Sequence, residues 1–403
     1  MVDIAGVDFM ANNRKDSKGR VLKTGEHQRS DGTYHYTYLD PLKKRKYVYA
    51  KTLKELREKE KEIQRDSLDG IDSSKGKTTL NQLYKMNMEL KNDLRESTRA
   101  NYDAMWRNNV ENSVIGNRKI SDIKQVHVKA FYNDCVKKGL KRNTIKLLHN
   151  LIFSSFELAV DSDWIRKNPA KDAMESIKQD SAEKKPLTEI DIKNLMNFCT
   201  KSGTYSIHVP FLTIAIGTCL RCGELTGLTW NDVDMKKRTI RIDHQLVYKN
   251  YGDGCKFHIS KPKTDAGKRT IPMTESVYGA FIEVKKQNIL LGRRSSAEVD
   301  EYSDFVFVSG NGQPLAINAV NSFLLNIEKA YNKNNPQAPI PHLSAHILRH
   351  TGCTLLASAG IDVKALQNVM GHSDASITMN VYNHGSFERT EKELQRIDDI
   401  MVI

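Results

Sequence analysis

Alternating aromatic and polar positions near the N-terminus predict a small antiparallel sheet. The segments TYHYTYLD and KRKYVYAK both carry a tyrosine at every second position, and DPLKK lies between them with turn-forming residues. Period-two alternation on both sides of a turn is typical of a β-hairpin. The tyrosines of the two segments are Tyr34, Tyr36, Tyr38, Tyr47 and Tyr49.

A helical pattern follows the sheet. Thr52 and Glu55 form a T-x-x-E capping box, and LKELREKEKEIQRDSL continues the pattern until Gly70. The next stretch, IDSSKGKTT at residues 71–79, holds no large apolar residue after Ile71. We expect this stretch to be a linker.

A second helical region spans about residues 80–175. In NTIKLLHNLIFSSFELAV the apolar positions lie three or four residues apart, which places them on one helix face. The region closes with DWIRKNPA, where Asn168 precedes Pro169 and stops the helix, and KQDSAEKKP forms a second linker. The apolar face comprises Ile145, Leu148, Ile152, Phe156 and Ala159.

The remaining residues, 184–403, predict an α-rich domain with a small inserted antiparallel sheet. A helix starts at Thr188 with Asp191 at the third following position, and the apolar run HVPFLTIAIGTCLRCGELTGLTW is helical but broken by glycines. Strands are expected in TIRID, in KFHIS, at the end of KPKTDAGKRTIP, and in FVFVS at residues 305–309. Helices return from Pro341 onward.

These patterns predict a multi-domain, mainly α protein with little β structure, because 403 residues exceed one comfortable core. The first domain, 1–75, is a three-stranded sheet plus a helix. The second, 76–178, is entirely helical, and the third, 184–403, is the α-rich domain with the small sheet.

The charge balance favours a polyanionic partner. The chain has a formal net charge of +13, and much of the surplus lies between Arg14 and Lys51. A basic aromatic sheet can lie along a nucleic-acid groove, although a solvated charged face is the simpler alternative. No run of 18 apolar residues occurs, so neither a membrane span nor a membrane partner is predicted.

The cysteines point to a reducing compartment. Six of them are scattered along the chain, too few for a disulfide scaffold, and the N-terminus lacks the basic and apolar regions of a secretory signal. We therefore expect a cytoplasmic protein. Cys219 and Cys222 form a lone C-x-x-C pair with no second pair after it, so neither zinc nor redox chemistry is predicted there.

A group of basic residues could bind a phosphate. Arginine offers paired donors that match phosphate oxygens, lysine can deliver a proton, and histidine can donate or accept one. Each residue also has a simpler explanation, such as a helix cap or a turn. The candidates are Arg221, Lys263, His346, Arg349 and His372, and Tyr382 supplies a nucleophile.

The order of these residues resembles the tyrosine recombinases, the DNA-cutting and rejoining family of phage and transposon integrases. The motifs are TCLRCGEL, KPKT, HILRH, MGHSD and NVYNH. The helical segment ending in DWIRKNPA is similar to the core-site-binding domain of that family. RVLKTGEHQRSDGTYHYTYLD resembles the arm-site-binding domain of conjugative-transposon integrases.

The resemblance implies a site-specific recombinase that excises and integrates a mobile element through a 3′-phosphotyrosyl intermediate. Tyr382 would be the nucleophile, Arg221 and Arg349 would bind the nonbridging oxygens, and Lys263 would be the general acid. Lys261 and Lys268 remain alternatives to Lys263. His346 and His372 would assist, and Glu224 would orient a nearby basic group. No metal, ATP or other cofactor is expected, because the sequence offers no carboxylate cluster of the kind that two-metal nucleases use.

The implied partner is double-stranded DNA at core and arm attachment sites in a bacterial cytoplasm. A tetrameric synapse on DNA is also expected. The need for an excision factor stays open, as does docking of the tail after Tyr382 in cis or in trans. Two rivals remain: a DNA-binding regulator that does not cut, and a topoisomerase that only relaxes DNA. The candidate arm-site contacts are Arg14, Lys18, Arg20, Lys23, Tyr34, Tyr36, Tyr38, Lys44, Arg45 and Lys46.

Overall fold

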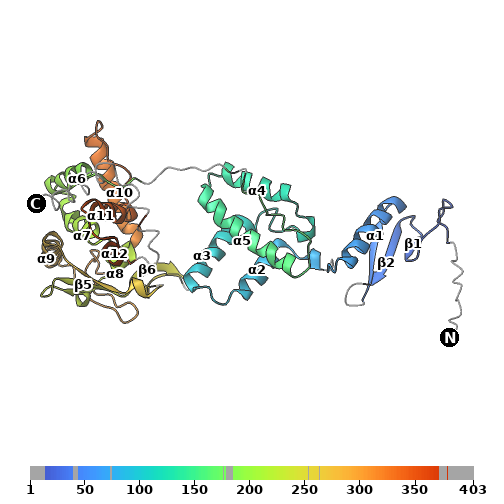
Figure 1. Cartoon of the computed structure of the whole chain (residues 1–403), viewed down its shortest axis with the longest axis horizontal. Coiled ribbons are helices and arrows are strands. Elements are labelled where there is room, and N and C mark those ends of the chain that lie inside the picture. Colours follow the sequence, from blue (N-terminus) through green and yellow to red (C-terminus); the bar gives the residue numbers. More distant parts are fainter. Residues whose placement is uncertain are drawn as a thin grey trace, which may run out of the picture. The chain divides into compact units, whose positions relative to one another are not determined.

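Two compact units make up the chain. They comprise residues 1–181 and 182–403, and Figure 1 shows their helices and strands in sequence colours. The computed structural model describes residues 14–39, 44–72, 75–175, 177, 185–252, 254–262, 264–371 and 379.

The N-terminal sheet is three-stranded and antiparallel, in the order β1, β2, β3, as predicted. α1 packs on one of its faces, where Tyr34 and Ala50 meet Leu53 and Leu56 in a small buried cluster. Thr52 caps α1 by accepting a hydrogen bond from the backbone N–H of Glu55. The elements are β1 (Glu26–Gln28), β2 (Tyr34–Leu39), β3 (Arg45–Ala50) and α1 (Leu53–Leu68).

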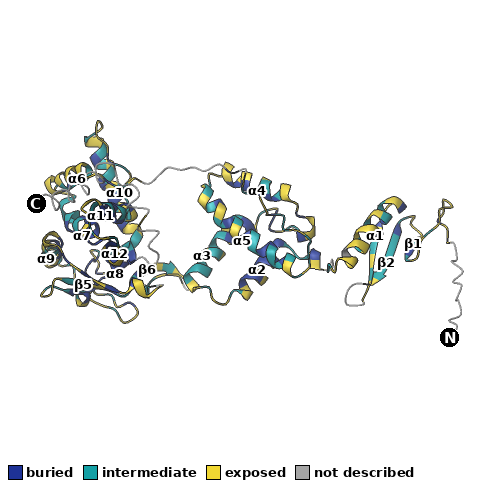
Figure 2. Ribbon diagram, viewed as in Figure 1, coloured by how far each residue is buried: buried dark blue, intermediate teal, exposed yellow. Residues whose placement is uncertain are grey.

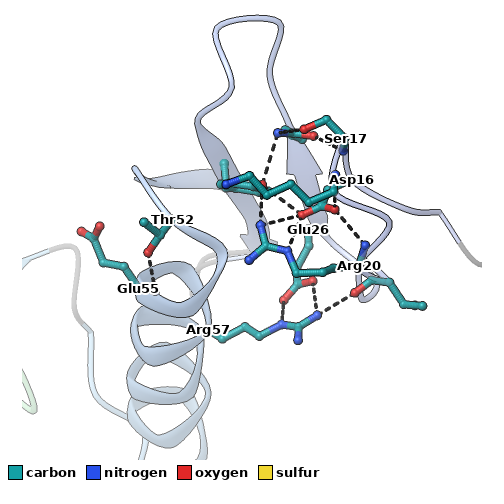
Figure 3. A network of polar contacts seen from close by, with 11 residues as sticks. Asp16, Ser17, Arg20, Glu26, Thr52, Glu55 and Arg57 are labelled. Atoms are coloured by element: carbon teal, nitrogen blue, oxygen red, sulfur yellow. Dashed lines mark hydrogen bonds and ion pairs between the residues drawn. The ribbon is translucent and has the colours of Figure 1, made fainter.

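An ion pair between a partly exposed arginine and a buried carboxylate joins this sheet to its helix. Arg57 on α1 donates from Nε to Oε1 of Glu26 on β1 over 2.8 Å, and its Nη2 donates to the backbone oxygen of Val21 over 2.7 Å (Figure 3). The Glu26 side chain is fully buried, so losing Arg57 would leave an unpaired buried charge. A second network in the same view links Arg20 with Asp16.

The rest of the first unit is helical, as predicted. Its core is one continuous cluster in which the rings of Tyr84 and Trp106 stack with their centroids 3.8 Å apart, and Figure 2 marks its residues as buried. The prediction that Asn168 and Pro169 stop the last helix is wrong, because α5 already ends at Asp161, where Ser162 is the C-cap. Asn168 lies in the segment that follows, and its side-chain oxygen accepts from the N–H of Ala170. The elements are η1 (Lys75–Lys77), α2 (Leu80–Leu90), α3 (Glu96–Trp106), η2 (Arg107–Glu111), η3 (Ile120–Asp122), α4 (Gln125–Lys137) and α5 (Arg142–Asp161).

The second unit surrounds an apolar helix, α7, that packs against α9 and α11. Thr188 and Asp191 form a capping box at the start of α6, as expected. The helices are α6 (Glu189–Lys201), η4 (Ser206–His208), α7 (Val209–Thr218), α8 (Cys222–Gly227), η5 (Trp230–Asp232), η6 (Asp265–Gly267), α9 (Glu275–Leu290), α10 (Ile317–Asn334), α11 (Ala345–Ser358) and α12 (Val363–Met370).

The strands of the second unit form two antiparallel sheets, one in the order β4, β5, β8 and the other pairing β6 with β7. The predicted strands in TIRID, KFHIS and KRTIP are present, and β4 and β6 are additional strands that the sequence patterns did not indicate. The elements are β4 (Val233–Asp234), β5 (Thr239–Ile242), β6 (Gln245–Asn250), β7 (Cys255–Ser260) and β8 (Arg269–Pro272).

The prediction of a strand in FVFVS at 305–309 is wrong. Phe305 and Val308 form only isolated bridges, with Thr229 and Pro314 respectively. The segment is buried and apolar because it fills the core beside α7, where the rings of Phe307 and Phe211 lie 5.1 Å apart. A short apolar run can therefore be buried without joining a ladder. In the part of the chain that the structure describes, no helix is long and apolar enough to cross a membrane.

Candidate active site

Arg221 lies at a sharp break between α7 and α8. The break occurs at Cys219, whose backbone is left-handed with φ 53°, and Arg221 is the N-cap of α8. α8 lies close against β6, because a Cβ at Gly223 would come 2.8 Å from the backbone oxygen of Leu246. The start of α8 is therefore fixed, while the Arg221 side chain stays 42% exposed.

Glu224 lies one turn into α8 and is 5% exposed. Its carboxylate is the group that the nearby arginines contact. It accepts from Nη1 of Arg221 over 2.8 Å and from the Arg221 backbone N–H over 2.9 Å. Arg269 on β8 donates from Nη2 over 2.9 Å. Burial opposes ionisation, but the hydrogen bonds from Arg269 and Arg221 outweigh it and hold the pKa of Glu224 below its usual value. The expected pairing of Glu224 with a nearby basic group is present, and its orienting role stays a prediction.

Arg349 reaches the same place from α11. A Cβ at Gly352 would come 2.1 Å from the backbone oxygen of Ile216, so α11 and α7 are held in close contact. The Nη1 atom of Arg349 donates to the Cys219 oxygen over 2.6 Å and lies 4.0 Å from Glu224. Burial, and then the neighbouring Arg221, lower the pKa of Arg349 to about 10. The guanidinium therefore keeps its charge at neutral pH.

Three arginines hold the last carbonyl groups of α12. Arg269 Nε donates to the Val369 oxygen over 2.9 Å, and Arg349 Nη2 donates to the Met370 oxygen over 2.8 Å. Arg221 Nη2 donates to the Gly371 oxygen over 3.2 Å. The C-terminal end of a helix carries partial negative charge, so cations are favoured there. His372 directly follows this end.

The structure thus brings Arg221 and Arg349 together, and His346 lies exposed one turn before Arg349 on α11. Lys263, His372 and Tyr382 lie outside the described residues. Arg269 was not predicted. Its signal was present in RTIP, where alternation places Arg269 with buried Ile271 on the inner face of β8. A buried arginine in a strand needs a carboxylate partner, and that partner is Glu224.

One of the predicted DNA contacts in the N-terminal sheet is buried. Tyr34 is only 3% exposed, and its hydroxyl donates to Asp16 and accepts from Arg20. The prediction that Tyr34 contacts DNA is wrong, because α1 covers that face of β2. Tyr36 and Lys46 are half-buried, as is Tyr38. The exposed cations among the predicted contacts are Arg14, Lys18, Arg20, Lys23, Lys44 and Arg45.

The face of this sheet opposite α1 is more exposed. Tyr47 and Tyr49 on β3 are half-exposed and pair across the ladder with Thr37 and His35. The guanidinium of Arg29 lies over the Tyr49 ring, 5.4 Å from its centroid. These two tyrosines were part of the predicted alternation. The alternation does not say which face of the sheet stays uncovered, because that depends on where α1 packs.

One group of described residues has the composition of a metal site: Asp232, Asp243 and His244. Its atoms already have protein partners. Asp232 accepts from Thr229 over 2.6 Å and from Arg241 over 3.0 Å, while the His244 ring lies 2.7 Å from Asp243. The group is best described as a polar network that supports the turn between β5 and β6.

Comparison with known proteins decides the family. A model described as the phage integrase family matches residues 185–389. A transposase from transposon Tn916 of Enterococcus faecalis is 34% identical over 405 aligned positions, which cover 96% of this chain and 98% of the relative. The chain belongs to the phage integrase family. Further integrase models match the N-terminal part: the DNA binding domain of Tn916 integrase at residues 10–67, and the SAM-like N-terminal domain of phage integrases at 79–136.

Other phage integrase family members support the same assignment. A XerC-like tyrosine recombinase of Caldanaerobacter subterraneus subsp. tengcongensis is 27% identical, with 89% of this chain and 92% of the relative covered. The Tn1549 transposon integrase, solved in complex with transposon right end DNA, matches with a TM-score of 0.70 at 33% identity over 80% of this chain and all of that one. The protein is accordingly a tyrosine-type site-specific recombinase, similar to the integrases of conjugative transposons.

Proposed function

We propose that this integrase excises and integrates a mobile element by cleaving and rejoining DNA strands, with Tyr382 as the nucleophile. The observation that carries the proposal is the convergence of Arg221 and Arg349 on Glu224 and on the end of α12. Two guanidinium groups held side by side offer paired donors suited to one phosphodiester.

The proposed chemistry is a pair of transesterifications. The phenol oxygen of Tyr382 attacks the phosphorus, a bond to the DNA 3′ phosphate forms, and the bond to the 5′ oxygen breaks. A proton passes to the leaving 5′ oxygen, and a 5′ hydroxyl later reverses the step on a new partner strand. The phosphotyrosyl bond conserves the energy of the cleaved bond, so the balance needs neither water nor ATP.

Each proposed catalytic residue has a separate role in these two steps. Arg221 and Arg349 stabilise charge on the nonbridging oxygens, and removing one such donor costs about 3 to 4 kcal/mol of transition-state stabilisation. Lys263 protonates the leaving oxygen. Tyr382 needs help at neutral pH because a phenol has a pKa of about 10, and His346 assists it as a proton acceptor. His372 donates to a nonbridging oxygen.

The DNA partner follows from charge and from the relatives. The chain carries a net charge of +13, and exposed cations and aromatic rings share the N-terminal sheet. A solved lambda integrase tetramer is bound to a Holliday junction, and we propose that this integrase also assembles as a tetramer on DNA. Three domains, at 1–75, 76–178 and 184–403, would bind arm sites, bind core sites and perform catalysis. An excision factor would set the direction of the reaction.

A suicide substrate tests the proposal. Wild-type protein and the Tyr382→Phe variant are mixed with DNA from the ends of the encoding element, nicked so that the cleaved strand diffuses away. A covalent protein–DNA complex with wild type alone supports the recombinase function. Tight binding without a covalent complex would favour a regulator that does not cut. Relaxation of plasmid DNA without strand exchange would favour a topoisomerase.

A further inference from the structure

We propose that Arg269 is a positioning residue for DNA cleavage, which orients Arg221 through Glu224 and holds the end of α12. The inference rests on the proposed function, because its effect is measured on the cleavage step. Arg269 belongs to none of the motifs TCLRCGEL, KPKT, HILRH, MGHSD and NVYNH, and it is placed by β8 alone.

Arg269 is more completely enclosed than the arginines proposed to bind phosphate. Its side chain is 1% exposed, compared with 42% for Arg221 and 7% for Arg349. A guanidinium buried to that extent is costly unless its donors are matched. The Nη2 and Nη1 atoms lie 2.9 Å and 3.3 Å from the two Glu224 oxygens, while Nε and Nη1 donate to backbone oxygens. With almost no exposed surface left, this guanidinium acts on its neighbours and not on DNA.

The charge balance explains how Arg269 would act on Arg221. Glu224 is the carboxylate to which Arg221, Arg269 and Arg349 all lie within ion-pair distance. Arg269 neutralises Glu224 from the buried side, so the charges of the other two arginines are available to a phosphate. Without Arg269, the negative charge of Glu224 would offset the positive charge of Arg221 or of Arg349. The two oxygens would also lose the partner that fixes their direction toward Arg221.

Arg269 also fixes the segment that leads into His372. Its Nε holds the Val369 oxygen, and its Nη1 holds the Gly267 oxygen over 3.2 Å, four residues after Lys263. The guanidinium lies so close to Gly371 that a Cβ there would come 2.7 Å from Nη1. One buried side chain therefore links α8, the segment before β8 and the end of α12.

The test measures single-turnover formation of the covalent complex by the full-length protein at saturating DNA. Arg269→Gln and Arg269→Lys are compared in the wild-type background and in the Arg221→Lys background, with DNA affinity and melting temperature measured for each. Arg241→Gln is the matched control, because Arg241 lies on β5, the strand next to β8, and pairs over 3.0 Å with the buried Asp232 of η5. A misplaced reacting group can slow a reaction about 100-fold.

The expected result is a rate about 100-fold lower for Arg269→Gln, with unchanged DNA affinity, partial recovery in Arg269→Lys and no loss in Arg241→Gln. In the Arg221→Lys background the same change should cost far less, because the two residues act as one unit. Equal losses in both backgrounds, or a wild-type rate in folded Arg269→Lys together with an unfolded Arg269→Gln, would overturn the inference. If wild type itself forms no covalent complex, the proposed function fails instead.

Discussion

Arg269 Nη2 lies 2.9 Å from Glu224 Oε2, and this buried ion pair joins residues that are 45 positions apart in the sequence. Both side chains are almost fully buried, at 1% and 5% exposure. Removing one partner of such a pair leaves a buried charge uncompensated. The pair therefore connects the stability of the catalytic unit with the geometry of its phosphate-binding arginines.

Glu224→Gln should lower the free energy of unfolding by about 3 to 5 kcal/mol, the usual cost of breaking a buried ion pair on one side. The amide cannot carry the negative charge that Arg269 and Arg221 share. Chemical denaturation measures the change. The control is Glu275→Gln, because Glu275 pairs with Arg238 while 78% exposed, and exposed pairs contribute about 1 kcal/mol or less. Equal losses for the two variants would contradict the special status of Glu224.

Gly371→Ala should be more destabilising than Gly292→Ala. Both glycines have left-handed backbones, with φ of 62° and 61°, so both substitutions carry the same backbone strain of about 1 to 2 kcal/mol. A Cβ at residue 292 meets no atom within 4 Å, whereas a Cβ at residue 371 would press against the Arg269 guanidinium. The additional loss in the free energy of unfolding of Gly371→Ala measures the cost of that contact. Two equal losses would mean that Arg269 moves aside freely.

Acid should remove part of the stability of the catalytic unit. Burial opposes the charge of Glu224, but the bonds from Arg269 and Arg221 keep its pKa below the ordinary value of 4.5. A carboxyl with a lowered pKa in the folded state contributes stability above that value and loses it as the pH falls further. Denaturation at pH 7 and near pH 3.5 should therefore show the difference between wild type and Glu224→Gln shrinking in acid. A difference that stays constant would mean that the stability does not depend on the ionisation of Glu224.

The sequence could predict the local elements of this site but not its long-range partners. Arg221 and Glu224 lie three apart, so their pairing follows from helix geometry. The pairing of Glu224 with Arg269 depends on where the tertiary fold places β8 relative to α8, which no local pattern encodes. In the N-terminal sheet, period two predicted the strands that carry Tyr34 and Tyr49, yet the packing of α1 decided that Tyr34 is buried and Tyr49 is not.

The face of the N-terminal sheet opposite α1 should supply DNA affinity in a salt-dependent way. Arg45 lies exposed on β3 next to this face. Arg45→Ala should weaken duplex binding and reduce the slope of log affinity against log salt by about one, as expected for one lost phosphate contact. Fluorescence anisotropy at several salt concentrations measures the slope. The control is Lys61→Ala on the exposed side of α1, and a similar change in both variants would place the DNA on a different face.

Identification of the residue that carries the DNA tests the central claim most directly. The covalent complex formed on a suicide substrate is digested with nuclease and protease, and the modified peptide is sequenced by mass spectrometry. The account predicts a nucleotide attached through its 3′ phosphate to Tyr382. Attachment to any other residue, or cleaved DNA with free 3′ ends and no attached peptide, would contradict it.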